Sequence, residues 1–257
     1  MSATVRLAEV TAYLDSYLRV REIPDSEAAL NGLQAENVSG RVTRIVAAVD
    51  ASLATIAAAG REPGTLILVH HGLFWDGNLP LTGRRYRRVR ALLDADLALY
   101  SAHIPLDVHP EVGNNHELAR RIGVRDLQPF DLYRGTPIGV QGVLDGEVSR
   151  EDFVARVDQI LGSSARLIPG GPAAVRRVGV ITGGAGDRIG AAAQAGLDTF
   201  LTGEGAHHTF FDAMELGINA IYAGHYATET VGVKALAEHL SARFGIPWEF
   251  HDHPTGL

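Results

Sequence analysis

Residues 65–72 read Thr-Leu-Ile-Leu-Val-His-His-Gly, a short apolar run that ends in two adjacent histidines. Similar runs rich in Val, Ile, Leu and Thr recur along the chain and alternate with longer amphipathic stretches. That alternation is typical of strand–helix–strand units around a mainly parallel sheet. The expected fold class is therefore α/β, with mainly parallel or mixed sheets.

The positions of the expected elements follow from the same patterns. Ser149 is expected to cap the helix that begins at residue 150, with Asp152 three residues on. We expect strands near Arg44–Val49, Thr65–His70, Leu97–His103, Pro137–Leu144, Arg166–Pro169, Val178–Thr182, Thr199–Thr202, Asn219–Ala223 and Trp248–His251. We expect helices over Val5–Leu18, Tyr86–Ala95, Asn114–Ile122, Arg150–Leu161, Ile189–Ala195, Phe210–Leu216 and Thr230–Phe244.

The rhythm of strands and helices repeats along the chain, which indicates two similar α/β halves. We expect the first half at residues 1–125, completed by residues 225–257, and the second half at residues 126–224. Residues 127–137 mix Pro, Gly and Asp with aromatic side chains and are expected to cross between the halves. They are no flexible linker, because such linkers are Gly/Ser-rich or highly charged.

Composition excludes several classes of protein and site. The 257 residues include no cysteine, which excludes disulfides, thiolate nucleophiles and zinc sites that use sulfur. Any metal must then be held by imidazole and carboxylate. The formal charge of −7 argues against a protein that mainly covers nucleic acid, since phosphate binding needs clustered Lys and Arg. No apolar run approaches the roughly 20 residues of a membrane helix, and the N-terminus lacks signal-peptide order, so we expect a cytoplasmic protein without membrane contact.

Most of the eleven histidines lie where predicted strands end. In open α/β sheets, ligands bind in the crevice beyond the carboxyl ends of the strands. Neighbouring side chains on a strand point to opposite faces, so His70 and His71 reach one site only if the chain leaves the ladder there; Gly72 would ease that turn. For a lone histidine the alternative is a polar residue at the sheet rim, which fits an adjacent pair less well.

Two further motifs have competing interpretations. His225 and Glu229 are four residues apart, so a helix that starts near residue 226 would bring both to one side. Glu229 taken alone is equally explained as a carboxylate that complements the helix dipole. The run Gly183-Gly184-Ala185-Gly186-Asp187 resembles a nucleotide-binding turn, but it lacks the G-x-G-x-x-G order and a phosphate-contacting Lys, which favours a plain tight turn.

Four motifs in order carry a family resemblance over nearly the whole chain. They are Val-His-His-Gly-Leu-Phe-Trp at 69–75, Ser-Ala-His-Ile-Pro-Leu-Asp at 101–107, Thr-Gly-Glu-Gly-Ala-His-His at 202–208 and Ala-Gly-His-Tyr-Ala-Thr-Glu at 223–229. With them the chain resembles the dinuclear-metal family of GTP cyclohydrolase 1 type 2 homologues, also called NGG-interacting-factor-like proteins. The resemblance implies two α/β halves and a ring-like homohexamer, and we expect the dinuclear metal site in the cleft between the halves.

The resemblance also implies the residues of the site. The family's metal ligands fall on His70, His71, Asp107, His225 and Glu229. Candidates for proton transfer, or for fixing the second nitrogen of a metal-bound histidine, are His103, Glu204, His207 and His208. Imidazole and carboxylate suit Zn, Fe, Mn or Ni, so ligand type leaves the identity of the two divalent ions open.

The leading functional hypothesis is a hydrolase that depends on the metal pair. Two carboxylate ligands leave about two of the four metal charges uncompensated, which should attract phosphate or another anionic group. We therefore expect a nucleotide-like or phosphorylated small molecule as substrate, with GTP ring opening suggested only by the family name. One alternative is a metal-binding regulator, chaperone or scaffold without turnover, and another is a nucleotide-binding module without metal. An open, water-occupied metal position would favour the hydrolase, since structural sites are closed.

Overall fold

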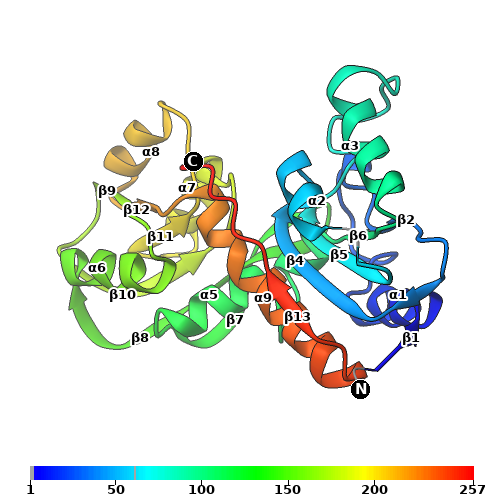
Figure 1. Cartoon of the computed structure of the whole chain (residues 1–257). Helices are drawn as coiled ribbons and strands as arrows, with labels where there is room; N and C mark the ends of the chain where they lie inside the picture. Colours follow the sequence, from blue (N-terminus) through cyan, green and yellow to red (C-terminus); the bar gives the residue numbers. More distant parts are fainter. Residues whose placement is uncertain (1–2, 61) are drawn as a thin grey trace. The chain divides into compact units, whose positions relative to one another are not determined.

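The computed structural model describes residues 3–60 and 62–257, which form two compact units (Figure 1). Unit 1 comprises Met1–Val112 and Gly232–His253, and unit 2 comprises Gly113–Val231 and Pro254–Leu257. The helix α9 (His225–Phe244) contributes to both units. Both sheets described below mix parallel and antiparallel strands, which confirms the α/β class with mixed sheets. Among the described helices, none has the length and hydropathy needed to cross a membrane.

Unit 1 is built on a five-stranded sheet in the order β13-β4-β5-β6-β2. The first four strands are parallel to one another, and β2 runs antiparallel to β6. Their carboxyl ends therefore meet at one edge of the sheet. The strands span Gly32–Ala35 (β2), Arg44–Asp50 (β4), Thr65–His71 (β5), Ala98–Ser101 (β6) and Trp248–Phe250 (β13).

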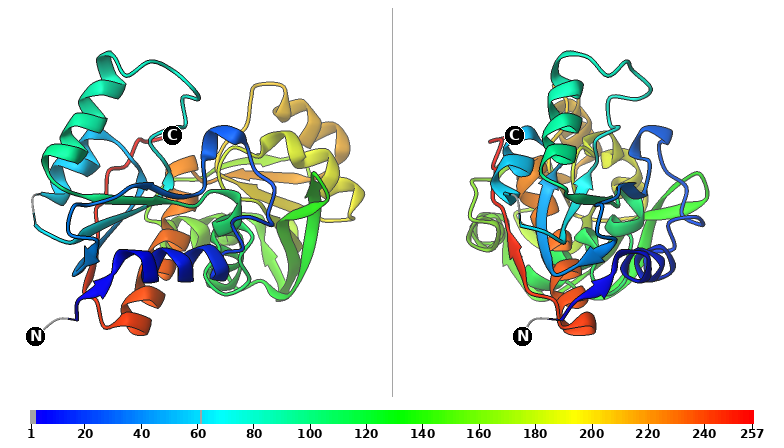
Figure 2. Two further views of the ribbon diagram at one scale, coloured as in Figure 1. Left: turned by 90° about the vertical axis from the view of Figure 1, so that its right-hand side faces the viewer. Right: turned by 45° about the vertical axis from the view of Figure 1, so that its right-hand side comes forward.

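Helices cover both faces of this sheet, and Figure 2 shows α1 and α3 on opposite sides of it. On one face Ile56 and Leu92, from α2 and α3, join a buried apolar cluster with strand residues such as Ile67. On the other face Tyr100 of β6 donates a 2.8 Å hydrogen bond from its hydroxyl to Oδ1 of Asp15 in α1. The remaining elements are β1 (Val5–Arg6), α1 (Leu7–Tyr17), η1 (Glu27–Ala29), β3 (Arg41–Val42), α2 (Leu53–Ala59), α3 (Gly83–Asp94) and α4 (Ile104–Asp107).

Unit 2 is built on a six-stranded sheet in the order β7-β8-β10-β11-β12-β9. Its three strands β10, β11 and β12 are parallel, and the others pair antiparallel. Successive residues Phe200 and Leu201 of β11 enter separate buried clusters, one on each face. The strands span Arg125–Tyr133 (β7), Thr136–Ser149 (β8), Arg166–Pro169 (β9), Ala174–Val180 (β10), Thr199–Thr202 (β11) and Asn219–Tyr222 (β12).

The helices of unit 2 divide between the two faces. Phe153 of α6 and Leu118 of α5 belong to the cluster that contains Leu201, whereas Ile189 of α7 and Ala213 of α8 belong to the cluster that contains Phe200. The helices span Asn114–Arg121 (α5), Arg150–Leu161 (α6), Gly186–Arg188 (η2), Ile189–Gln194 (α7) and Thr209–Leu216 (α8).

Several expected elements are confirmed with the bounds given above, namely the strands β9 and β11 and the helix α6. The expected cap is also confirmed, because Oγ of Ser149 accepts a 3.0 Å hydrogen bond from the backbone N–H of Asp152. The expectation for residues 127–137 is wrong, since they form most of β7, a turn and the start of β8 within unit 2. Pro129 is tolerated there because β7 is the edge strand of its sheet.

Candidate metal centre

His70 and His71 are the last two residues of β5. The ladder continues to His71, which pairs with Asp50 of β4, so the expectation that the chain leaves the ladder at the pair is wrong. The two imidazole rings still lie close, with centroids 4.8 Å apart. Gly72 has no positive φ. It is needed for space, because an added Cβ would meet the side-chain amide of Gln34.

Hydrogen bonds fix which ring nitrogen of each histidine faces outward. Nδ1 of His70 lies 2.9 Å from the backbone oxygen of Ala102, and Nδ1 of His71 lies 3.0 Å from Oδ1 of Asp50. Because these oxygens only accept, each Nδ1 carries the proton and donates it. The lone pair of each ring is then on Nε2, which is the tautomer that a metal-binding histidine needs.

Asp107 and His103 join this group through the short helix α4. His103 directly precedes α4, and its Nδ1 bonds Oδ1 of Asp25 at 2.9 Å. Burial raises the pKa of Asp25, but the hydrogen bond and charge of His103, together with hydrogen bonds from Asn31 and Ser26, outweigh it and lower the pKa overall. Asp107 ends α4, and its Oδ1 lies 3.5 Å from Nε2 of His70.

The donor atoms of unit 1 fit a metal ion in kind and in spacing. Ligand nitrogens of His70, His71 and His103 all lie within 4.8 Å of one another, so this cluster could hold a metal. Two ligands at about 2.0–2.1 Å from a tetrahedral metal lie about 3.3 Å apart. The 3.5 Å between His70 and Asp107 is close to that separation.

A second donor group lies in unit 2, where α9 begins. His225 is the first residue of α9, so the helix starts earlier than residue 230, where it was expected. Glu229 follows one turn later, and its Oε1 lies 3.3 Å from Nε2 of His225. The other ring nitrogen, Nδ1, lies 2.8 Å from Oε1 of Glu204 in the loop after β11. His225 thus has the same arrangement as His70, with Nδ1 held by an oxygen and Nε2 beside a carboxylate.

The two carboxylates determine the protonation of His225. Burial lowers the pKa of His225, but the hydrogen bonds and charges of Glu229 and Glu204 outweigh it and raise the pKa to about 9. In the metal-free protein the protonated ring therefore lies between two negative groups. A divalent cation at Nε2 would replace that proton and meet the same negative charge.

Glycines allow the close packing around this group. Gly183 follows β10 with φ of +70°, and an added Cβ there would collide with Oε1 of Glu229. At Gly203 an added Cβ would lie 2.6 Å from Cα of His225. The glycine-rich run at 183–187 is thus a tight turn packed against the donors of unit 2.

The remaining candidates lie elsewhere in unit 2. His207 lines a pocket beside α8, and His208 is exposed at the start of that helix. Within residues 3–60 and 62–257, neither imidazole bonds a residue expected to ligate metal. Their catalytic roles stay predictions.

Sequence reasoning missed two carboxylates that hold histidines. Asp50 directly follows the strand expected at Arg44–Val49, so its place at a strand end is a signal that the sequence does contain. Asp25 lies in a loop before η1 and bonds both Nδ1 of His103 and the backbone N–H of Ile104. No local pattern marks it, because its partners are far away in the sequence.

Comparisons with known proteins agree over nearly the whole chain. A protein of Deinococcus radiodurans named GTP cyclohydrolase 1 type 2 homolog is 48% identical over 249 residues, which cover 97% of this chain and 94% of that protein. The solved structure of TTHA1606 from Thermus thermophilus is 42% identical, with a TM-score of 0.88 and coverage of 98% and 100%. A structural-genomics structure of protein ybgI, of unknown function, is 34% identical, with a TM-score of 0.91 and the same coverage.

A family model covers the same extent of the chain. Residues 5–255 match the model described as Duf34/NIF3 (NGG1p interacting factor 3). This match includes both donor groups and both sheets. The chain therefore belongs to the Duf34/NIF3 family.

Proposed function

We propose that this protein is a hydrolase that depends on two divalent metal ions and acts on a nucleotide-like or phosphorylated small molecule. The proposed ligands are His70, His71 and Asp107 from unit 1 together with His225 and Glu229 from unit 2. The metals are taken from Zn, Fe, Mn and Ni, which suit imidazole and carboxylate donors.

One observation carries the proposal. All three histidines proposed as ligands have Nδ1 bonded to an oxygen, from Ala102, Asp50 and Glu204 respectively. Such partners fix the tautomer and the orientation of a metal-bound imidazole and raise its basicity. A single bond of this kind is ordinary for a histidine at a sheet rim. Three such bonds, each at Nδ1, leave Nε2 as the metal-binding atom in all three histidines.

The chemistry of the donor set supports a substrate with negative charge. A bound metal pair acts as a Lewis acid on a phosphoryl or carbonyl oxygen and lowers the pKa of water. Asp107 and Glu229 neutralise only part of its charge. His103, whose Nδ1 is held by Asp25, is proposed to accept and return a proton at Nε2. Asp50 and Glu204 are proposed as positioning residues, because they act through His71 and His225.

The relatives guide the choice of first substrates. The Deinococcus radiodurans protein bears the name GTP cyclohydrolase 1 type 2 homolog. That name belongs to the relative, and it supports testing nucleotides, GTP included, before other phosphoesters.

The test is a hydrolysis assay with matched variants. Protein loaded with each metal in turn is assayed against a panel of nucleotides and phosphoesters. Turnover should stop when a chelator removes the metal, and His70→Ala and Glu229→Ala should each abolish it. Glu151→Ala, which removes an exposed carboxylate of α6, should leave turnover unchanged. Turnover that survives both ligand substitutions would remove the hydrolase proposal, whereas tight metal binding without turnover would leave a metal-binding regulator, chaperone or scaffold.

We also propose that the chain assembles into a homohexamer, as the family resemblance implies. Sedimentation velocity should show a species of six chains. A monomer or dimer at micromolar concentration would contradict this assembly.

A further inference from the structure

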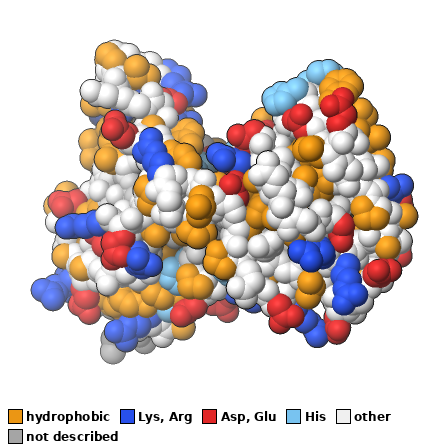
Figure 3. Space-filling view, turned by 180° about the vertical axis from the view of Figure 1, so that it is seen from behind, with side chains coloured by type: hydrophobic (Ala, Val, Ile, Leu, Met, Phe, Trp, Pro, Cys, Tyr) orange, Lys and Arg blue, Asp and Glu red, His pale blue; other side chains and the backbone are white. Residues whose placement is uncertain are grey.

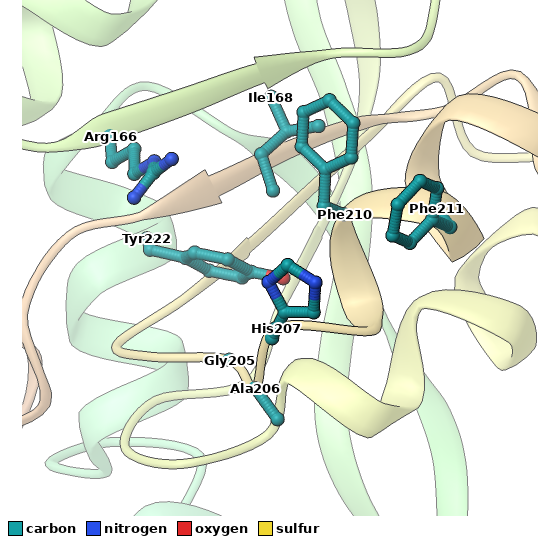
Figure 4. Close-up of a pocket in the computed structure, with 8 residues that line it drawn as sticks. All are labelled: Arg166, Ile168, Gly205, Ala206, His207, Phe210, Phe211 and Tyr222. Atoms are coloured by element: carbon teal, nitrogen blue, oxygen red, sulfur yellow. The ribbon is translucent and has the colours of Figure 1, made fainter.

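A pocket lies beside α8 in unit 2, with a cavity volume of about 360 Å³ (Figure 4). That volume falls within the range of small-molecule sites, which is about 300–1,000 Å³. We call it the α8 pocket, and its lining includes Arg166, His207, Phe210, Phe211 and Tyr222. None of these residues is a proposed metal ligand.

Strand register explains why a cation and an aromatic ring share this pocket. Arg166 of β9 pairs directly with Tyr222 of β12, so both side chains lie on the same face of the sheet. Ile168, two residues along β9, lies on that face too and forms the apolar floor. Figure 4 shows Arg166, Ile168 and Tyr222 on the strands, with Phe210 of α8 beside Ile168 and Phe211 farther along the helix.

The wall made by Tyr222 is held in place. Its hydroxyl bonds Oγ1 of Thr209, the first residue of α8. Gly205 lets the ring pass, because an added Cβ at residue 205 would collide with the phenol. The ring thus forms a fixed surface of the pocket and does not have to be ordered by a ligand.

The other aromatic rings are open to solvent. Phe210 is 41% exposed and Phe211 is 51% exposed, and the ring of His207 meets that of Phe211 edge to face with centroids 5.9 Å apart. Figure 3 shows histidine side chains next to hydrophobic and acidic ones at the end of unit 2 that carries α8. Exposed rings around a cavity offer stacking surface to a flat ligand.

The charge of Arg166 is uncompensated in the pocket. Its guanidinium makes no ion pair with any residue in the described ranges. Burial raises the pKa of the Tyr222 hydroxyl, and the charge of Arg166 acts in the opposite direction. The negative charge of Asp212 in α8 raises the pKa of Tyr222, and the same charge would repel an anionic ligand. A guanidinium presents a planar fork of donors that matches carboxylate and phosphate oxygens.

We propose that the α8 pocket binds a small molecule that carries a flat aromatic ring and an anionic group. The ring stacks on Phe210 and Tyr222, and the anion pairs with Arg166. The shared chemistry fits a nucleoside phosphate and an aromatic carboxylate alike. This site goes beyond the proposed hydrolase, because it contains none of the metal ligands and does not depend on turnover.

The test is calorimetric titration of the full chain after metal removal, so that metal-bound phosphate does not contribute. The probes are adenosine 5′-monophosphate, adenosine, ribose 5-phosphate and 2-naphthoate. Adenosine 5′-monophosphate should bind at one site per chain, and the two fragments should each bind at least about tenfold more weakly. If 2-naphthoate binds as tightly as the nucleotide, the pocket favours aromatic carboxylates; the reverse favours nucleoside phosphates.

Matched variants assign the binding to this pocket. Arg166→Gln should weaken binding about tenfold, the loss of one charge-assisted hydrogen bond, and Phe210→Ala should do the same through lost stacking. Arg176→Gln repeats the first change, and Leu216→Ala truncates another exposed apolar side chain of α8; both lie outside the lining and should leave binding unchanged. Asp212→Asn should tighten binding.

Three results would overturn the proposal. The first is no saturable binding of either anionic probe up to about 1 mM. The second is binding that Arg166→Gln and Phe210→Ala leave intact. The third is that no probe binds the wild-type chain and that the two variants differ from it in sedimentation coefficient. That result would show that a second copy of the chain covers the exposed rings. Failure of the hydrolase assay would leave these outcomes unaffected.

Discussion

The two units present their donor atoms from different kinds of backbone. In unit 1, His70 and His71 are strand residues: His71 pairs with Asp50 of β4, and the ring of His70 is held by the backbone oxygen of Ala102. In unit 2, His225 and Glu229 lie in the first two turns of a helix, and their positions depend on Glu204 and on glycine turns. The sheet therefore positions the two histidine ligands of unit 1, whereas side-chain contacts and close packing position the ligands of unit 2. Single substitutions should therefore lower metal affinity more in unit 2 than in unit 1.

The largest difference in metal affinity is expected between alanine substitutions at two glycines, one in each unit. Gly183→Ala forces a Cβ onto Glu229 at a left-handed φ, which costs about 1–2 kcal/mol in backbone strain alone. Metal affinity should fall by about 100-fold or more as Glu229 is displaced. Gly72→Ala in unit 1 meets only the side chain of Gln34, so its affinity should change far less. Competition with a chromogenic chelator measures the metal affinity of each variant. Equal affinities in Gly183→Ala and Gly72→Ala would contradict the predicted difference between the units.

The next contrast compares the two positioning carboxylates. Glu204→Gln and Asp50→Asn each remove a charge from a partner of Nδ1, which typically costs about 10–100-fold in metal affinity. The loss should be larger for Glu204→Gln, because unit 1 keeps a second histidine fixed by a backbone oxygen. Chelator competition gives the affinities, and denaturant midpoints should barely move. A larger loss of metal affinity in Asp50→Asn than in Glu204→Gln would contradict the prediction that unit 2 is the more sensitive.

A smaller effect tests whether stability and metal binding are separable in unit 2. Ser149→Ala removes the cap of α6 and should lower the free energy of unfolding by about 1 kcal/mol. Metal affinity should stay at the wild-type value, because α6 carries no donor residue. A parallel loss of metal affinity would mean that the donors of unit 2 are sensitive to any loss of stability in that unit.

The smallest effect concerns a histidine of unit 1 that is not one of the proposed metal ligands. Burial lowers the pKa of His239, whose Nε2 lies 2.5 Å from the hydroxyl oxygen of Tyr13. A lowered pKa in the folded state means that the unfolded chain binds the proton more readily, so this contribution is complete above the unfolded pKa of about 6.5 and is lost as pH falls below it. The fall in denaturant midpoint between pH 8 and pH 5.5 should be smaller in His239→Gln than in the wild type. An unchanged fall would show that His239 does not contribute.

Sequence patterns identified the elements whose own residues determine them. The apolar runs of β9 and β11 and the capped helix α6 depend on local composition, so their bounds were predicted as observed. The strand β7 was missed because Pro129 and two residues with left-handed φ, Asp126 and Asp131, look like loop residues. That strand exists because β8 pairs with it, which is a tertiary cause.

The same division applies to the candidate site. Histidines at strand ends and the four-residue spacing of His225 and Glu229 are visible in the sequence. Asp25 and Glu204 act on histidines 78 and 21 residues away, so no local spacing marks them as partners. The role expected for Gly72 was wrong for a similar reason, since its neighbour Gln34 comes from a different strand.

Anomalous diffraction from crystals of the metal-loaded protein tests the central claim most directly. Data collected at the absorption edge of the loaded metal should show two peaks per chain, with side-chain donors of His70, His71, Asp107, His225 and Glu229 at about 2.0–2.3 Å. A structure with no such peaks, or with metal held only by the three histidines of unit 1, would contradict it.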